Sequence, residues 1–225
     1  MLIVSIKKKA IIIVLCCIFM LSATLSLPSI FAQAKTFNYT VVIDAGHGGF
    51  DGGSVSPYSD ADENHLNLQY ALTLKEILNK AGIGVVLTRK NLNGLYSLFA
   101  ENRKKDDMKK RIEIIEKSGA NLVVSIHMNS FPLRSSRGAQ VFYKEDNASS
   151  QFLANNIQQV FYENLPHGRK EAKPGDYYIL NQSPIPSVIV ECGFLSNKED
   201  EQLLQDSIYR SKVCTAIAYG IIISL

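Results

Sequence analysis

Short runs rich in valine and isoleucine alternate with longer segments of helical periodicity from Thr40 onward. The predicted strands are Val41–Asp44, Gly84–Thr88, Leu122–Ile126, Ala139–Tyr143 and Val188–Val190. The predicted helices are Asn67–Ala81, Asp106–Ser118, Asn147–Leu165 and Asp206–Ile223. Strands that are apolar throughout are typical of a sheet that is covered by helices on both faces. The sequence therefore predicts an α/β fold: a single domain with a twisted, mostly parallel central sheet flanked by helices.

The first 34 residues have the composition of a secretory signal peptide. Residues 7–9 are lysines, Ala10–Leu27 is nearly all apolar, and residues 32–34 form an A-x-A cleavage site. An uncleaved membrane anchor is the alternative, because an apolar run of this length is almost enough to span a bilayer. We expect cleavage after Ala34, which leaves residues 35–225 as the domain that is exported across the cytoplasmic membrane.

The first 34 residues, which we call the leader, also explain the basic net charge of the chain. Three of the 24 lysines and arginines lie in it, which leaves 21 basic residues against 21 acidic ones. A net charge near zero predicts no nucleic-acid partner, and we expect membrane contact only through the leader, if it is uncleaved. Cys192 and Cys214 lie in apolar stretches, where two buried free thiols are more plausible than a disulfide framework.

Three of the predicted strands lead into a side chain that can bind a metal ion or a proton. The first, third and fifth strands are followed closely by His47, His127 and Glu191. Ligands of open α/β sheets bind in the crevice beyond the carboxyl ends of the strands, so these side chains are expected to meet there. Taken alone, a histidine after a strand is more often a surface residue, and a glutamate there is more often a salt-bridge partner. The chain has only four histidines, however, and two of them occupy this place.

Two imidazoles and a carboxylate suit zinc, whose catalytic sites use three protein ligands and keep one position for water. The third ligand is either Glu191 or a member of the stretch SDADENHLN, which supplies Asp60, Asp62, Glu63 and His65. An acidic stretch before a helix more often complements the helix dipole. A hydrolase also needs a general base beside the metal. The residues alone do not decide which carboxylate binds the metal and which accepts the proton.

Five sequence blocks follow one another between Val41 and about Asn197: IDAGHGGFDGG, ENHLNLQYALTLKEIL, VVLTR, SIHMNS and VIVECGFLSN. Together they resemble the zinc-dependent N-acetylmuramoyl-L-alanine amidases of the Amidase_3 family. The resemblance implies that His47, Glu63 and His127 bind Zn²⁺. It also implies that Glu191 is the catalytic residue, which takes the proton of the attacking water and passes it to the departing amine.

The family resemblance implies hydrolysis of the amide between the lactyl group of muramic acid and the L-alanine of the peptidoglycan stem peptide. Residues 35–225 are then the amidase catalytic domain. We expect Asp44 and Asn129 to orient the metal ligands. The other two histidines, His65 and His167, fall outside the family motifs and are expected to take no part.

A single domain without wall-binding repeats resembles the CwlD type of spore-forming bacteria. This implies removal of stem peptides in the spore cortex on the way to muramic-δ-lactam. The alternatives are a zinc peptidase that cuts within the stem peptide and a non-catalytic wall-binding or scaffold protein on an amidase fold. Near-zero net charge gives little attraction to an anionic wall. We therefore expect the site of export, or a second protein that positions or regulates the domain, to bring it to the cell wall or cortex space.

Overall fold

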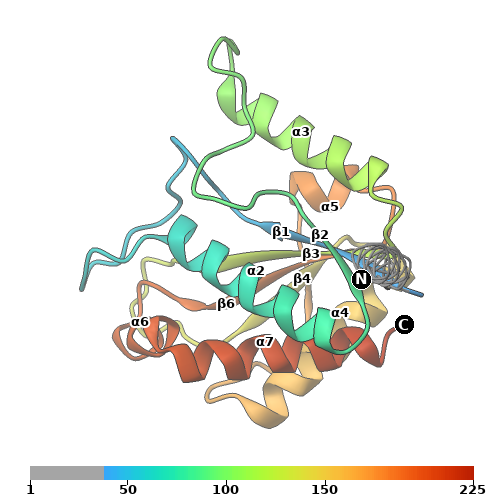
Figure 1. The fold of residues 1–225 in the computed structure, drawn as a ribbon. Helices are drawn as coiled ribbons and strands as arrows, with labels where there is room; N and C mark the ends of the chain where they lie inside the picture. Colours follow the sequence, from blue (N-terminus) through green and yellow to red (C-terminus); the bar gives the residue numbers. More distant parts are fainter. Residues whose placement is uncertain (1–37) are drawn as a thin grey trace, which may run out of the picture. The chain divides into compact units, whose positions relative to one another are not determined.

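The computed structural model describes residues 38–225, which form a six-stranded sheet between two layers of helices (Figure 1). The strands are β1 (Thr40–Ala45), β2 (Gly84–Leu87), β3 (Leu122–Asn129), β4 (Gln140–Tyr143), β5 (Lys173–Pro174) and β6 (Ser187–Phe194). The helices are α2 (Glu63–Lys80), α3 (Arg103–Lys117), α4 (Ala148–Asn164), α5 (Tyr178–Gln182), α6 (Lys198–Gln205) and α7 (Ser207–Ile222). This architecture confirms the predicted α/β fold. The predicted leader and its cleavage site lie outside the described residues.

The strand order is β2-β1-β3-β6-β4-β5. The β4–β6 pair is antiparallel and the other four pairs are parallel. Strands β1, β3 and β6 therefore end at the same edge of the sheet, which we call the carboxyl edge. At this edge His127 of β3 is the register partner of Glu191 of β6. Register partners project from the same face, so both side chains leave the sheet in the same direction.

Alternation along β1 decides what lies on each face of the sheet. Val41 and Ile43 face the larger core, which the sheet forms with α2, α4 and α7. Val42 faces the smaller core, which is covered by α3 and α5 (Figure 1). Because side chains two residues apart share a face, Asp44 also points toward α3. No helix among residues 38–225 is long and apolar enough to cross a membrane.

Several elements extend beyond their predicted bounds, and the differences involve polar residues. Helix α2 begins at Glu63 because the Asp62 side chain accepts a hydrogen bond from the backbone N–H of His65 at 2.8 Å. Strands β3 and β6 continue past their apolar runs, so His127 and Glu191 lie inside strands and not behind them. The short elements β5, α5 and α6 were not predicted, since they are too brief to show a period.

Both cysteines of the domain are buried free thiols, as predicted. The Cys214 thiol donates to the backbone carbonyl of Tyr70 at 3.4 Å, and Cys192 lies within β6. Burial raises the pKa of each thiol well above its ordinary value. Because the thiolate is the reactive form, these cysteines have a structural role and no nucleophilic one.

A buried ion pair joins β1 to α3. Arg111 Nη1 lies 2.6 Å from Asp44 Oδ1, and both side chains are at most 2% exposed. The hydroxyls of Ser125 and Thr88 also donate to the Asp44 carboxylate, at 2.6 and 2.7 Å. Burial alone would raise the pKa of Asp44, but Arg111 and the two hydroxyls outweigh it and lower the pKa to about 2. The carboxylate is therefore charged at neutral pH.

Asp44→Asn should lower the free energy of unfolding by about 3–5 kcal/mol at neutral pH, because it leaves the Arg111 charge buried without its partner. The carboxylate has a lower pKa in the folded chain than in the unfolded one. Its stabilising effect is therefore complete above about pH 4 and is lost as the pH falls toward 2. The difference in urea-unfolding free energy between wild type and variant should shrink over this window.

The control for this experiment is Glu113→Gln, which removes an exposed pair with Lys117 at 3.7 Å. It should change the free energy of unfolding little at any pH. A cost of Asp44→Asn that stays constant from neutral pH down to about pH 3, or that is no larger than the cost of the control, would contradict the assigned ion pair.

Candidate metal centre

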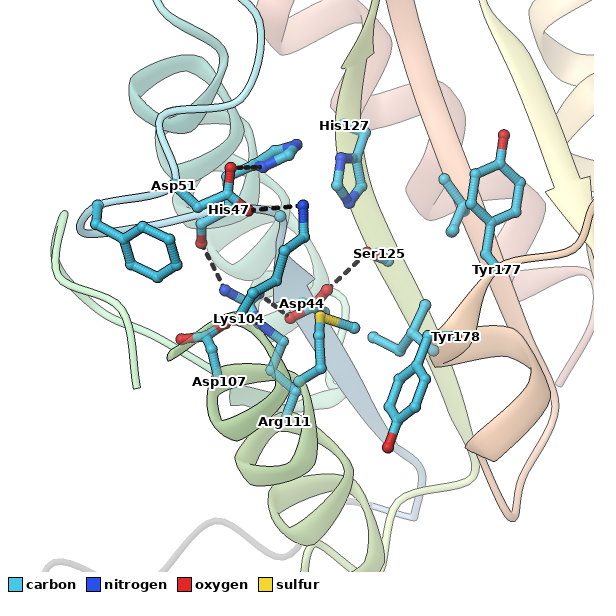
Figure 2. Close-up of a pocket in the computed structure, with 15 residues that line it drawn as sticks. Asp44, His47, Asp51, Lys104, Asp107, Arg111, Ser125, His127, Tyr177 and Tyr178 are labelled. Carbon is cyan, nitrogen blue, oxygen red and sulfur yellow. Dashed lines mark hydrogen bonds and ion pairs between the residues drawn. The ribbon is translucent and has the colours of Figure 1, made fainter. Parts of the chain in front are cut away.

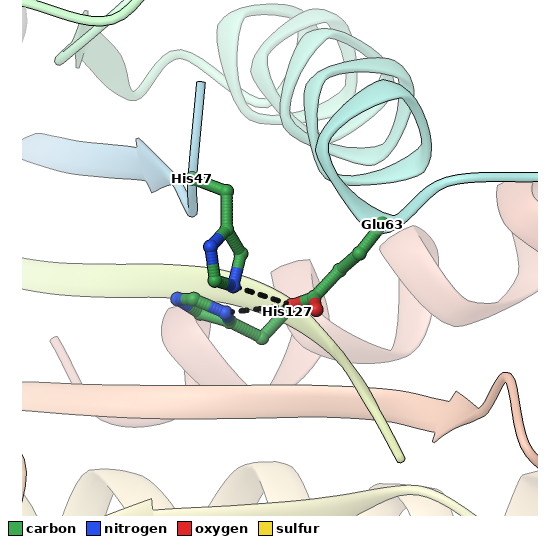
Figure 3. Close-up of side chains that lie close together, drawn as sticks. All are labelled: His47, Glu63 and His127. Atoms are coloured by element: carbon green, nitrogen blue, oxygen red, sulfur yellow. Dashed lines mark hydrogen bonds and ion pairs between the residues drawn. The ribbon is translucent and has the colours of Figure 1, made fainter. Parts of the chain in front are cut away.

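His47, Glu63 and His127 come together at the carboxyl edge of the sheet (Figure 3). His47 Nε2 lies 3.1 Å from Glu63 Oε1, and His127 Nδ1 lies 2.9 Å from the same oxygen. One ligand atom from each residue lies within 4.8 Å of the others. A tetrahedral zinc ion with ligands at about 2.0–2.1 Å keeps them about 3.3 Å apart. The donor set and its spacing therefore fit zinc.

Glu63 is the member of the acidic stretch that faces the two histidines. It is the first residue of α2, and its side chain is 4% exposed. Burial alone would raise the pKa of Glu63, but hydrogen bonds and positive charge from His127 and His47 outweigh it and lower the pKa. Asp62 instead caps the helix, and Asp60 is exposed. Within the acidic stretch, Asp62 therefore has a role at the helix start, and Glu63 is the residue that is placed where a metal could bind.

The backbone that carries His47 has a conformation that L-residues rarely adopt. Its φ is 61°, in the left-handed region, which is costly for a residue with a side chain. Two buried arginines hold this turn by its carbonyl groups. Arg89 donates to the carbonyls of Ala45 and Gly46 at 2.8 Å each, and Arg111 donates to the carbonyl of His47 at 2.5 Å. The imidazole is therefore positioned before any ligand binds.

Arg89 also links the His47 turn to the helix that carries Glu63. Arg89 Nη2, which donates to Gly46, also donates to the backbone carbonyl of Asn64 at 2.9 Å; Asn64 is the second residue of α2. Asp51 lies on the other side of the imidazole, where its Oδ1 is 2.9 Å from His47 Nδ1 in an ion-pair contact (Figure 2). A carboxylate on one ring nitrogen leaves the other nitrogen free to bind a metal, which is the usual arrangement around metal-binding histidines.

Glu191 lies beside the three-residue cluster but in a different environment. It is 9% exposed, and its Oε2 has no hydrogen-bond partner among the described residues. Burial raises the pKa of Glu191 to about 7; the Glu63 carboxylate adds to the rise, and His127 and His47 oppose it. A carboxyl group with a pKa near neutrality can both accept and return a proton during turnover. The environment thus distinguishes Glu191 from Glu63, which is held ionised.

Residues 41–222 match the model of the Amidase_3 family, described as N-acetylmuramoyl-L-alanine amidase. The chain belongs to this family. A germination-specific N-acetylmuramoyl-L-alanine amidase of Bacillus subtilis is 32% identical over 186 residues, which are 81% of this chain and 78% of the relative. The CwlD amidase from Clostridioides difficile, solved in complex with the GerS lipoprotein, is 38% identical with a TM-score of 0.80. That match covers 83% of this chain and 98% of the solved one.

A second solved N-acetylmuramoyl-L-alanine amidase, from Clostridium difficile 630, is 29% identical with a TM-score of 0.74. The match covers 83% of this chain and 96% of that structure. In both cases nearly the whole solved chain is matched, so the similarity extends over the domain and is not confined to one segment. The agreement between family, fold and cluster identifies residues 41–222 as an amidase domain.

Four other residues named in the sequence analysis lie outside the cluster of His47, Glu63 and His127. Asp44 acts through Arg111 and does not contact the cluster. Asn129 ends β3, where its backbone carbonyl accepts a hydrogen bond from Leu195. His65 is exposed and lies 3.0 Å from Asp62, and His167 lies 3.7 Å from Glu199. Neither of these two histidines belongs to the cluster.

Sequence reasoning assigned no role to Asp51, Arg89 or Arg111. A weak signal existed for the arginines: Arg89 is the second residue after the apolar strand β2, and Arg111 precedes Ile112 on the side of α3 that faces the core. A charged residue at a buried position usually has a specific partner. Only the fold shows that these partners are the carbonyls of the His47 turn.

A hollow opens beside the amidase cluster, between α3 and α5 (Figure 2). We call it the α3–α5 hollow; it has a volume of about 150 Å³. His47 and His127 line its upper end, and Met108, Ile179 and Ile189 give it apolar walls. The hollow is the space next to the cluster that a substrate group can enter.

Glycine is required where the backbone packs directly against the side chains of the cluster. A Cβ atom on Gly46 would lie 2.2 Å from Cε1 of His127. A Cβ atom on Gly53, which has a φ of 70°, would lie 2.6 Å from Oε2 of Glu63. Gly46 and Gly53 of the IDAGHGGFDGG block thus make room for the histidine and glutamate side chains.

Gly46→Ala should displace the His127 ring and weaken zinc binding by about 10- to 100-fold, the range seen when groups that orient metal ligands are lost. Zinc dissociation constants from competition with a chromophoric chelator would measure the effect. Gly52→Ala is the matched control, because a Cβ atom there meets nothing within 4 Å. Equal zinc affinity of the two folded variants would show that His127 is not a ligand.

Proposed function

We propose that this amidase uses zinc to hydrolyse the amide between the lactyl group of muramic acid and L-alanine, and that it removes stem peptides in the spore cortex on the way to muramic-δ-lactam. The observation that carries the proposal is the His47, Glu63 and His127 cluster with Glu191 beside it. The similarity to a germination-specific amidase and to a CwlD amidase supports the cortex as the place of action.

The side chains of the centre divide the reaction between them. When bound by His47, Glu63 and His127, a zinc ion supplies polarisation of the scissile carbonyl and lowers the pKa of a water molecule. Glu191 accepts the proton from the attacking water and returns it to the departing amine of L-alanine, so that the carboxyl group ends in its starting state. The raised pKa of Glu191 suits both steps.

We propose further that the domain acts outside the cytoplasmic membrane, after export through the leader, with a second protein as its positioning partner. Support comes from the CwlD amidase of Clostridioides difficile, which was solved together with a lipoprotein. The near-zero net charge of residues 35–225 agrees with this, because charge alone would hold such a domain only weakly at an anionic wall.

Mass spectrometry of purified muropeptides after incubation with the zinc-loaded protein tests the proposed reaction. The expected products are free muramic acid carboxyl groups and peptides that begin with L-alanine. New amino ends at a later residue would identify a zinc peptidase instead. Intact muropeptides in the presence of bound zinc would favour a non-catalytic wall-binding protein.

Glu191→Gln is the matched variant for this assay, because glutamine has nearly the same shape but cannot accept the proton. Turnover should fall by about 10²–10⁴-fold. Zinc content should stay at the wild-type level, since Glu191 is not among the three clustered residues. Loss of zinc together with turnover would mean that Glu191 is a ligand and that the roles of the two glutamates are reversed.

A further inference from the structure

Lys104 places an ammonium group at the mouth of the α3–α5 hollow (Figure 2). It lies in the first turn of α3, whose start is fixed by the Asn102 cap. Its Nζ lies 3.5 Å from Asp51 Oδ2, and the side chain is 69% exposed. At that distance the contact is an ion pair in water and not a tight hydrogen bond, so it holds the ammonium group only weakly.

The other cation that lines the hollow is not free to bind a ligand. Arg111 is 1% exposed and donates to Asp44, Asp107 and two backbone carbonyls. Its charge is therefore balanced within the protein. The Lys104 side chain, by contrast, is 69% exposed, and its ammonium group is paired only loosely with Asp51. Among the described residues that line the hollow, Lys104 is the cation that can meet a charged substrate group.

The size of the hollow indicates which half of the substrate enters it. About 150 Å³ between apolar walls of Met108, Ile179 and Ile189 has room for the methyl group of L-alanine but not for a glycan strand. The peptide part of the substrate then lies at the α3–α5 hollow, and the glycan part lies outside it. The next peptide residue reaches the mouth of the hollow, where Lys104 lies. In peptidoglycan this residue is a γ-linked D-glutamate, whose α-carboxyl group is either free or amidated.

We propose that Lys104 binds the free α-carboxylate of this second stem-peptide residue and so makes the enzyme prefer the acid over the amidated form. The proposal rests on the amidase activity proposed above. A charge-assisted hydrogen bond at a partly exposed site gives a preference of about 5- to 10-fold in kcat/KM. Because the carboxylate is not part of the reacting amide, most of the preference should appear in KM.

The test uses two synthetic muramyl peptides that differ only in the second residue, D-glutamate or D-isoglutamine. The zinc-loaded wild-type protein should cleave the acid 5- to 10-fold more efficiently, and high salt should reduce this preference. K104Q should bring the acid down to the rate of the amide at unchanged zinc content, and K104R should keep part of the preference. K105Q is the control: Lys105 is exposed and does not line the hollow, so the wild-type preference should remain.

Calorimetric binding of the released peptides, in the acid and the amide form, gives a readout that does not need turnover. Wild type should bind the acid more tightly and K104Q should bind both alike.

Equal cleavage and binding of the two forms by wild type would overturn the role of Lys104 while leaving the amidase activity intact. Equal losses on both substrates in K104Q would also overturn it, because Lys104 would then act on Asp51 and His47. A binding preference without cleavage of either substrate would support Lys104 and refute the proposed reaction.

Discussion

Hydrogen bonds from two buried guanidinium groups to the carbonyls of residues 45–47 hold the turn on which the rest of the site depends. Burying a guanidinium is costly unless its charge is balanced and its N–H groups have partners. Asp44 and Asp107 supply the charge for Arg111, and the turn supplies carbonyl acceptors for both arginines. The same contacts compensate for the left-handed φ of His47. The polar network between β1 and α3 thus links the fold to the geometry of the site.

The two glutamates of the site show how position decides chemistry. Glu63 begins a helix and lies within 3.1 Å of two imidazole nitrogens, which lower its pKa and keep it ionised. Glu191 lies inside a strand, with a carboxylate oxygen that has no hydrogen-bond partner among the described residues, and burial raises its pKa to about 7. One carboxylate therefore suits metal binding, and the other suits proton transfer. This division follows from the different surroundings of the two side chains.

The sequence was sufficient to predict the sheet and the edge at which the site lies. Each apolar run predicts a buried strand from local sequence alone. His47, His127 and Glu191 follow three of these runs, and the ends of parallel strands lie at the same edge of a sheet, so the three side chains could be expected to lie close together. The family resemblance, and not the residue pattern, selected Glu63 from the acidic stretch. Arg89, Arg111 and Asp51 could not be predicted in their roles, because their partners are backbone atoms or side chains that only tertiary contacts bring near. The need for Gly46 likewise depends on the position of a ring 81 residues away.

Zinc K-edge X-ray absorption of the zinc-loaded protein reports which atoms surround the metal and therefore tests His47, Glu63 and His127 as its ligands. We expect four nitrogen and oxygen donors at about 2.0–2.1 Å, with the outer-shell scattering of two imidazoles. Replacement of His127 by alanine should leave the scattering of one imidazole. A sulfur donor at about 2.3 Å, or a wild-type spectrum with a single imidazole, would contradict the assignment of His47, Glu63 and His127 as the metal ligands.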